Sequence, residues 1–105
     1  IALLERDLPV FIMSPSNNLY EKTVSNLNEV IARDASVILL TDQEGLDNIG
    51  HLKNKIKTFI LDETDIISAP FVYTLPNQLI AYHIALLKGT DVDQPRNLAK
   101  SVTVE

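Results

Sequence analysis

Three short apolar runs divide the first two thirds of the chain. They occupy residues 8–13, 35–40 and 56–61, and polar turn-forming residues follow each run. Continuous apolar runs of this length are typical of strands that are buried on both faces of a sheet. The pattern therefore predicts three β-strands over these ranges.

Between the first two runs, apolar residues recur at helical spacing. Four side chains separated by four, three and four positions share one helix face: Tyr20, Val24, Leu27 and Ile31. Such a stripe is typical of an amphipathic helix. Asn18, with Glu21 three positions later, is typical of a capping box at a helix start. We expect a helix over 19–33 with Asn18 as its N-cap.

The stretch 43–54 is polar and contains Gly45 and Gly50. Glycine and polar residues between periodic segments are typical of loops. We therefore interpret 43–54 as a loop with room for one helical turn.

The most apolar segment is 66–88, which contains Pro70 and Pro76. Proline fits the first turn of a helix and disrupts its interior, and glycine commonly follows a helix end. We predict a helix over 77–88 that starts at Pro76 and is capped by Gly89. A helical piece should precede it, with a kink or break at Pro76. Polar residues interrupt the segment too often for a membrane span.

Strands and helices in this order are typical of a parallel α/β sheet. Three strands are too few for a sheet that is covered on both faces, which suggests that further strands lie upstream of Ile1. The chain also begins without methionine. We interpret it as a fragment of a longer protein.

Composition narrows the range of functions. The chain has 105 residues, enough for one small domain, and its 46% hydrophobic and 22% charged residues are ordinary for a soluble globular protein. A net charge of −5 offers no basic surface for nucleic acid. The absence of cysteine excludes disulfides, thiolate zinc sites and a cysteine nucleophile.

Lys100 is a candidate for carbonyl chemistry. An amine that attacks a carbonyl must be neutral, whereas lysine has an ordinary pKa of about 10.4 and needs desolvation or a nearby cation to become nucleophilic. Apolar Leu98, Ala99 and Val102 flank it and would desolvate the amine in a folded pocket. Near a chain end, the residue pattern alone favours a solvated lysine. The residues by themselves leave both interpretations open.

Three weaker candidates have structural interpretations that we prefer. The turn-rich 14–18 segment could bind an anion, but it has no glycine or lysine and is better interpreted as a helix cap. The carboxylates within 62–65 could bind a metal, but a solvated loop is the better interpretation. His51 is placed in a loop, and His83 on an apolar helix is interpreted as a hydrogen-bonded core histidine.

Several segments carry a family resemblance. Residues 91–105 read DVDQPRNLAKSVTVE, residues 73–83 read YTLPNQLIAYH, and residues 1–4 and 7–10 read IALL and DLPV. Together they resemble the isomerising glutamine–fructose-6-phosphate aminotransferases, or glucosamine-6-phosphate synthases. The tail matches the family pattern throughout, whereas Asn77 replaces the family's usual leucine. The resemblance covers the whole chain and is weakest over 43–61.

The resemblance implies a fold and a division of the chain. We expect a flavodoxin-like sugar isomerase (SIS) domain, an α/β fold with a parallel sheet and helices on both faces, of which only the C-terminal part is present. Residues 1–90 would belong to the second of two such domains, and residues 91–105 would form a catalytic tail. The family's ring-opening histidine precedes Ile1, so neither His51 nor His83 corresponds to it.

The resemblance also implies an activity. The parent enzyme would make glucosamine 6-phosphate from fructose 6-phosphate and glutamine, with Lys100 as the catalytic Schiff-base lysine and with Ala99 and Lys100 binding the sugar. It would need no metal or organic cofactor. It would be a cytoplasmic homodimer with a glutaminase domain in the same chain, and would bind neither nucleic acid nor membrane. The 105-residue chain alone should be inactive. It should associate either through the 71–87 region or by strand exchange.

Two other functions remain open on the sequence. One is a different SIS-domain sugar-phosphate isomerase or deglycase. The other is a non-catalytic SIS module that senses sugar phosphates. The second has no need for a tail lysine, so covalent trapping of the substrate separates it from the aminotransferase.

Overall fold

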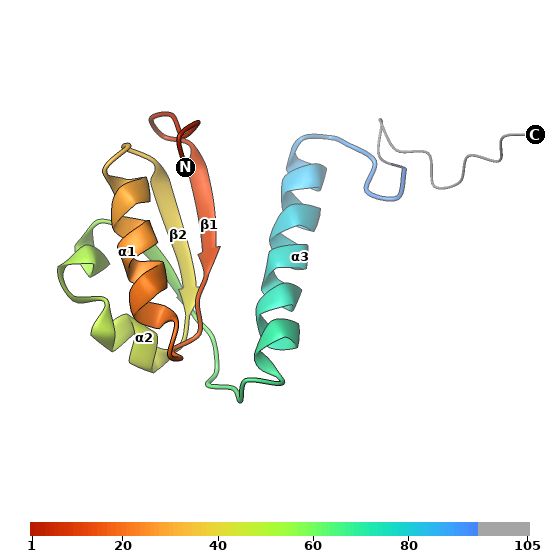
Figure 1. Ribbon diagram of the computed structural model, residues 1–105. Coiled ribbons are helices and arrows are strands. Elements are labelled where there is room, and N and C mark those ends of the chain that lie inside the picture. The colour runs from red at the N-terminus through yellow and green to blue at the C-terminus, as the bar shows by residue number, and fades with distance from the viewer. Residues whose placement is uncertain (95–105) are drawn as a thin grey trace, which may run out of the picture. The chain divides into compact units, whose positions relative to one another are not determined.

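The computed structural model describes residues 1–94 (Figure 1). The chain divides into two compact units, the first covering Ile1–Tyr73 and the second beginning at Thr74. We describe each unit by itself. The sheet and its hydrophobic core belong to the first.

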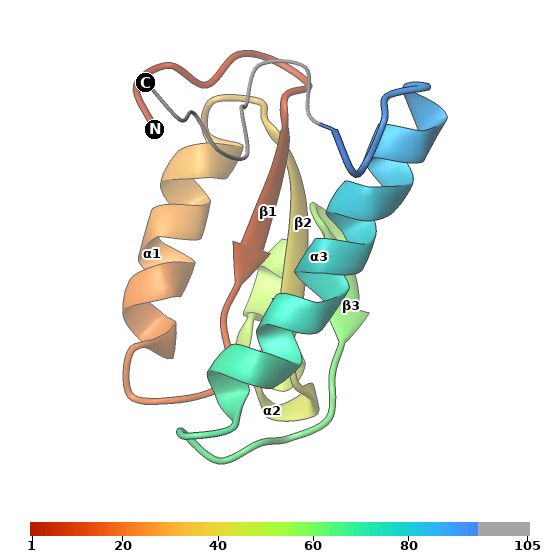
Figure 2. The same ribbon diagram turned by 90° about the vertical axis from the view of Figure 1, so that its right-hand side faces the viewer.

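Three parallel strands form the sheet of the first unit. They are β1 (Pro9–Met13), β2 (Ser36–Thr41) and β3 (Lys57–Ile60), and β2 lies between the other two (Figure 2). Each boundary lies within one residue of the predicted range, so the three-strand prediction is confirmed. In the register, Val10 lies opposite Val37, and Leu40 lies opposite Phe59.

Alternate residues of β2 build two separate hydrophobic clusters, because successive side chains of a strand point to opposite faces. Val37 and Leu39 face the helices α1 (Tyr20–Ile31) and α2 (Gln43–Asn48), which lie on one side of the sheet (Figure 1). This cluster is the larger one and contains Leu27, Val30, Val37, Leu39, Leu46, Ile49 and Leu52.

The opposite face of β2 contacts the start of a third helix, α3 (Ala69–Leu87). Leu40, which is 1% exposed, clusters there with Ala69 and Tyr73. The sheet therefore has helical residues against both faces. This confirms the expected α/β class with helices on both sides of a parallel sheet.

The start of α1 differs from the prediction. The N-cap residue is Leu19, and it makes no side-chain capping bond. The backbone N–H of Leu19 instead donates to the Asn17 side chain at 2.8 Å. Asn17 thereby closes a local turn through its own side chain. The capping box that begins at Asn18 is therefore wrong.

The loop interpretation of 43–54 is also wrong. This stretch contains α2 and a short 3₁₀ helix, η1 (Gly50–Asn54). Three apolar residues at steps of three positions are buried, and they are Leu46, Ile49 and Leu52. The helical spacing is present in the sequence, but the two glycines and the many polar residues hide it. Gly50 has a φ of 63°, a left-handed conformation at the junction of α2 and η1 that suits glycine.

Helix α3 runs through Pro76 without interruption. Of the predicted kink or break at Pro76, the break is therefore wrong. Proline's fixed φ near −65° is helical. Its costs inside a helix are one missing N–H donor and a clash of its ring with the carbonyl four residues earlier. Helical residues on both sides of Pro76 carry the helix past this defect. The prediction gave too much weight to one residue.

The C-terminal end of α3 is confirmed. Gly89 has a φ of 67°. Its N–H donates to the carbonyl of Leu86 at 2.9 Å, and the N–H of Thr90 donates to the carbonyl of Ala85 at 3.0 Å. This pair of bonds is the Schellman motif, in which glycine adopts the left-handed conformation.

Candidate functional site

The carboxyl ends of β1 and β2 meet at one edge of the sheet, because the two strands are parallel. Ser14 follows β1 and Asp42 follows β2. Ligands of open α/β sheets commonly bind at this edge. The residues that follow these two strands are therefore the first place to look for a site.

Asp42 is buried, with 3% of its surface exposed, and it joins two loops. One carboxylate oxygen accepts a hydrogen bond from the backbone N–H of Ser16 and the other from that of Gly45, both at 2.8 Å. Burial tends to raise the pKa of Asp42, but these bonds to the charged form outweigh it and lower the pKa below its ordinary value. The charged Asp42 side chain therefore links the β1–α1 loop to α2 through hydrogen bonds.

Thr41 and Gly45 pack closely beside Asp42. The Thr41 hydroxyl is fully buried and donates to the carbonyl of Ser14 at 2.7 Å. A Cβ added at Gly45 would lie 2.0 Å from Thr41 Oγ1 and 3.0 Å from a Tyr20 ring carbon. No larger residue fits at position 45 without a shift of these neighbours.

Two buried tyrosines lie near Asp42. The Tyr20 hydroxyl donates to the carbonyl of Gly45, and burial and the Asp42 charge raise the Tyr20 pKa against the opposing effect of Thr41. The Tyr73 hydroxyl is buried and has no hydrogen-bond partner in the described part of the chain. Burial, followed by the charge of Asp42, raises the pKa of Tyr73 to about 12. Both tyrosines are therefore neutral over the physiological pH range.

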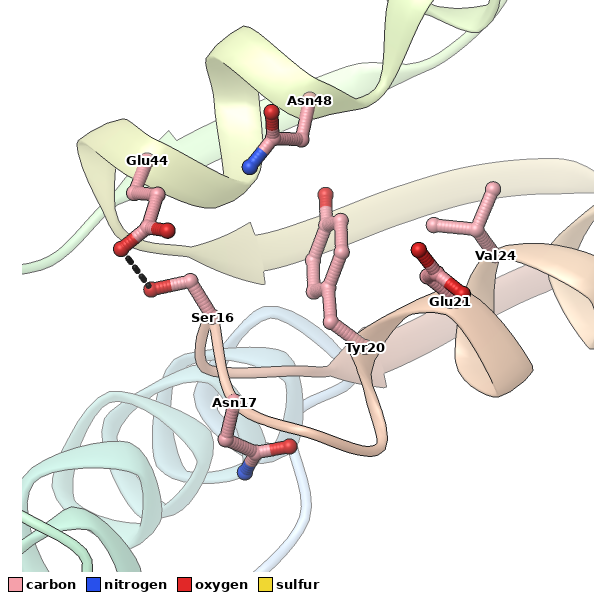
Figure 3. A pocket seen from close by; sticks show the side chains of 7 residues that line it. All are labelled: Ser16, Asn17, Tyr20, Glu21, Val24, Glu44 and Asn48. Carbon is pink, nitrogen blue, oxygen red and sulfur yellow. Dashed lines mark hydrogen bonds between the residues drawn. The ribbon is translucent and has the colours of Figure 1, made fainter.

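A cavity of about 560 Å³ opens between the β1–α1 loop, the first two turns of α1, and α2 (Figure 3). Glu44 and Asn48 project from α2, Glu21 and Val24 from α1, and the Tyr20 ring stands between the two groups. The seven lining residues are Ser16, Asn17, Tyr20, Glu21, Val24, Glu44 and Asn48. Its volume lies in the range of small-molecule sites.

Polar side chains line much of the cavity, and hydrogen bonds link its walls. The Ser16 hydroxyl donates to Glu44 at 3.3 Å. Together with the Ser16–Asp42 and Tyr20–Gly45 bonds, this contact ties the β1–α1 segment to α2. Two carboxylates line the cavity and its seven lining residues include no lysine or arginine. It is therefore unsuited to a phosphate group.

The sugar-site residues expected from the sequence, Ala99 and Lys100, lie outside the described residues. The 14–18 segment does lie at the carboxyl edge. Two of the nearby backbone N–H groups, those of Ser16 and Leu19, are already bonded to Asp42 and Asn17. These bonds favour a structural role for this turn over anion binding. The role is not the helix cap that we expected, because Leu19 is the N-cap residue and makes no side-chain capping bond.

The carboxylates after β3 form no metal site. Within residues 1–94, no group of three or more His, Cys, Asp or Glu residues is placed to hold a metal ion. Asp65 accepts bonds from the Ser68 hydroxyl and from the N–H groups of Ser68 and Ile67, and these bonds lower its pKa. Asp65 thus organises the turn that precedes α3.

The two histidines are both exposed. His51 lies in η1 rather than in a loop. His83 lies on α3, where its ring meets that of Tyr82 edge-on at 5.4 Å. The core position that we expected for His83 is therefore wrong in this chain. A helix that is apolar on all sides needs more than one neighbour to bury it completely.

Sequence reasoning missed the polar groups that shape the cavity. Asp42 was one of the polar residues that follow the predicted strand 35–40, and Gly45 was assigned to a loop. The available signal was an aspartate directly after a buried strand with a glycine three positions on, which is an N-cap pattern. Tyr73 gave no signal, because its burial depends on contacts with β2.

None of the helices in the described part of the chain has the length and hydropathy that a transmembrane segment requires.

Known proteins share the sequence and the fold. The SIS domain family matches residues 1–88. The glutamine–fructose-6-phosphate aminotransferases [isomerizing] of Brucella abortus and Zymomonas mobilis are 52% and 50% identical to this chain over all 105 residues. The chain spans only 17% of the length of these relatives.

A solved structure supports the same family relationship. The C-terminal domain of glucosamine-fructose-6-phosphate aminotransferase from Francisella tularensis superposes with a TM-score of 0.80 and 40% sequence identity. The match covers 89% of this chain and 26% of the solved one. The chain belongs to the SIS domain family and corresponds to part of the C-terminal domain of the isomerising glutamine–fructose-6-phosphate aminotransferases.

Proposed function

We propose that the full-length protein containing this chain is an isomerising glutamine–fructose-6-phosphate aminotransferase. It forms glucosamine 6-phosphate from fructose 6-phosphate and the nitrogen of glutamine. The observation that carries this proposal is the 52% identity to a protein of that name, which extends over the whole chain. In this proposal, residues 1–90 are part of the second SIS domain and residues 91–105 are a catalytic tail.

Within the tail, we assign Lys100 as the residue that forms a Schiff base with the open-chain sugar. The amine attacks the ketone carbon, and loss of water leaves an imine between Nζ and the sugar. Only the neutral amine has a free lone pair, so water must be excluded around it. The apolar neighbours Leu98, Ala99 and Val102 suit that requirement. The backbone of Ala99 would line the sugar site next to it.

The charge of the described cavity supports a separate location for the sugar phosphate. Glu21 and Glu44 line the cavity, and they would repel a phosphate monoester. The tail and the parts of the protein outside this chain are therefore the better candidates for the fructose 6-phosphate site.

The proposal includes the partners of the full-length protein. A glutaminase domain in the same chain would release the ammonia, and the protein would act as a homodimer in the cytoplasm. Imine formation and proton transfer can proceed with side chains alone, so no metal or organic cofactor is part of the proposal.

The decisive experiment is covalent trapping in the full-length protein. Borohydride reduction in the presence of fructose 6-phosphate should fix the sugar to Lys100, and peptide mass analysis should locate it. Lys100→Arg and Lys100→Ala should both abolish glucosamine 6-phosphate synthesis with the fold intact, because a guanidinium stays protonated and cannot form an imine.

Lys88→Arg is the matched control, because Lys88 is an exposed lysine at the end of α3. It should keep full activity and full trapping. An adduct on Lys88, or full activity in Lys100→Arg, would refute the assignment. Trapping without glutamine-dependent product would instead indicate another SIS-domain isomerase.

A further inference from the structure

The cavity between α1 and α2 belongs neither to the tail nor to the proposed sugar site. It lies wholly in the first unit, at the carboxyl edge of β1 and β2 (Figure 3). What it could bind follows from the rigidity, charge and shape of its walls.

The walls are held by bonds that cross between elements. Ser16 bonds to Asp42 through its backbone N–H and to Glu44 through its hydroxyl, and the Tyr20 hydroxyl bonds to Gly45. A buried carboxylate and a buried tyrosine thus link the cavity walls, and an exposed bond between Ser16 and Glu44 adds to them. A preformed site loses less entropy when a ligand binds.

The two glutamates that line the cavity favour binding of a cation. Glu21 on α1 and Glu44 on α2 lie on its two sides. The side chains of Glu21 and Asn48 make no hydrogen bond within residues 1–94. Free oxygens of a carboxylate and an amide are good acceptors for ammonium N–H groups.

Two of the lining side chains give the cavity apolar surface. The Tyr20 ring stands between the two groups of polar residues, and Val24 adds a second apolar surface. A bare metal ion is disfavoured, because residues 1–94 contain no metal-binding cluster. We propose that this cavity binds a small organic diamine, with one ammonium group at each glutamate and the methylene chain along Tyr20 and Val24.

The test compares putrescine with 1,4-butanediol, which has the same chain length but no charge. Binding to the full-length protein is measured by saturation-transfer NMR titration. Putrescine should bind about tenfold more tightly than the diol, and this advantage should shrink as salt is added, because exposed ion pairs are screened. Equal binding of the two compounds would overturn the proposal.

Glu21→Gln/Glu44→Gln is the variant that tests the site. Glutamine keeps the size of both side chains, and both positions are exposed, so the fold should be preserved. The double variant should bind putrescine about tenfold more weakly. Glu29→Gln, an exposed position on α1 outside the cavity, is the control and should bind normally. Unchanged putrescine affinity in the double variant would refute the site.

The result is independent of the proposed activity. Lys100→Ala removes the proposed catalytic amine and leaves the cavity intact, so it should bind putrescine as the unaltered protein does. A loss of putrescine binding in Lys100→Ala would place the diamine at the tail and overturn the cavity proposal.

Discussion

Helices α1 and α3 each place a buried tyrosine near Asp42, yet they differ in how much of their surface is buried. Helix α1 is amphipathic, with Tyr20, Leu27 and Val30 buried and polar residues on the opposite side. Helix α3 is apolar on all sides, and only Ala69 and Tyr73 are buried. Phe71 and Leu75 are more than half exposed.

This difference separates two roles. A helix with one apolar stripe is complete once that stripe is covered, and α1 finds its cover on the sheet. A helix that is apolar all round is adapted to burial on several sides. Helix α3 is therefore adapted to neighbours beyond its contact with Leu40, and the solved relative has about three quarters of its chain outside the match.

The largest expected effect compares one leucine from each helix. Leu27 is 1% exposed in the main core, whereas Leu79 on α3 is 58% exposed. Leu27→Ala should lower the free energy of unfolding by about 2–5 kcal/mol, through lost transfer energy and the cavity left behind. Leu79→Ala should cost less than about 0.5 kcal/mol in this chain.

Urea denaturation of the two variants checks this prediction. The same pair in the full-length protein sharpens it, because Leu79→Ala should become costly wherever α3 gains a neighbour. Equal losses from both substitutions in the 105-residue chain would contradict the distinction between the helices.

The second test concerns the close packing of Gly45 against Thr41 and Tyr20. Gly45→Ala should destabilise the first unit by about 1–3 kcal/mol, because its Cβ would meet the Thr41 hydroxyl at 2.0 Å. Gly50→Ala is the control: it has open space around it, but a φ of 63°. It should cost only the left-handed strain of about 1–2 kcal/mol. Crystal structures of both variants should show displacement of Thr41 in the first alone.

The third test uses pH. The pKa of Asp42 is lowered in the folded state, so its charge stabilises the fold above the ordinary aspartate pKa of about 3.9. That contribution is lost as the pH falls through the lower folded-state pKa. Asp42→Asn should remove this acid dependence and cost about 1–3 kcal/mol at neutral pH, because one buried N–H loses its acceptor. Urea midpoints from pH 2 to pH 7 measure both effects.

The smallest effects should come from the two tyrosine hydroxyls. Tyr20→Phe should cost about 1 kcal/mol, because the Tyr20 hydroxyl bonds to Gly45. Tyr73→Phe should be neutral or slightly stabilising, because the Tyr73 hydroxyl is buried without a partner in the described residues. Thermal unfolding of both variants ranks them, and a larger loss from Tyr73→Phe would contradict the structure.

Tyrosine ionisation gives an independent measure of Tyr73. Its pKa of about 12 lies above the ordinary value of 10.0. Because the folded state holds the Tyr73 proton more tightly than the unfolded state does, the free energy of unfolding should fall as the pH rises from about 10 to about 12. Alkaline absorbance titration should show a tyrosine that ionises near pH 12 and is absent in Tyr73→Phe.

The sequence was sufficient for features that depend on local pattern. The apolar runs gave the three strands, and Gly89 gave the end of α3, because burial on both faces and a left-handed cap each leave a clear signature. Prediction from the sequence failed where two local rules competed. Gly45 and Gly50 concealed α2 and η1, and Pro76 suggested a break in a helix whose neighbouring turns maintain it.

The candidate site divides in the same way. Lys100 came from a motif, which depends on neighbours in sequence, and it remains a prediction. The cavity depends on contacts such as Ser16 to Asp42, which lie 26 positions apart. No local pattern encodes such a pair. The burial of Tyr73 against Leu40 was hidden for the same reason.

Because the Schellman turn at Gly89 is fixed to the end of α3, the length of α3 determines the direction in which the chain leaves the helix. Each helical residue adds about 100° of rotation and 1.5 Å of rise. The bonds from Gly89 and Thr90 back to Leu86 and Ala85 fix the turn to the last residues of the helix. Deleting one residue from 77–84 would therefore swing the direction in which the chain leaves the helix by about 100°. Insertions and deletions in α3 should thus be tolerated far less than substitutions of its exposed side chains.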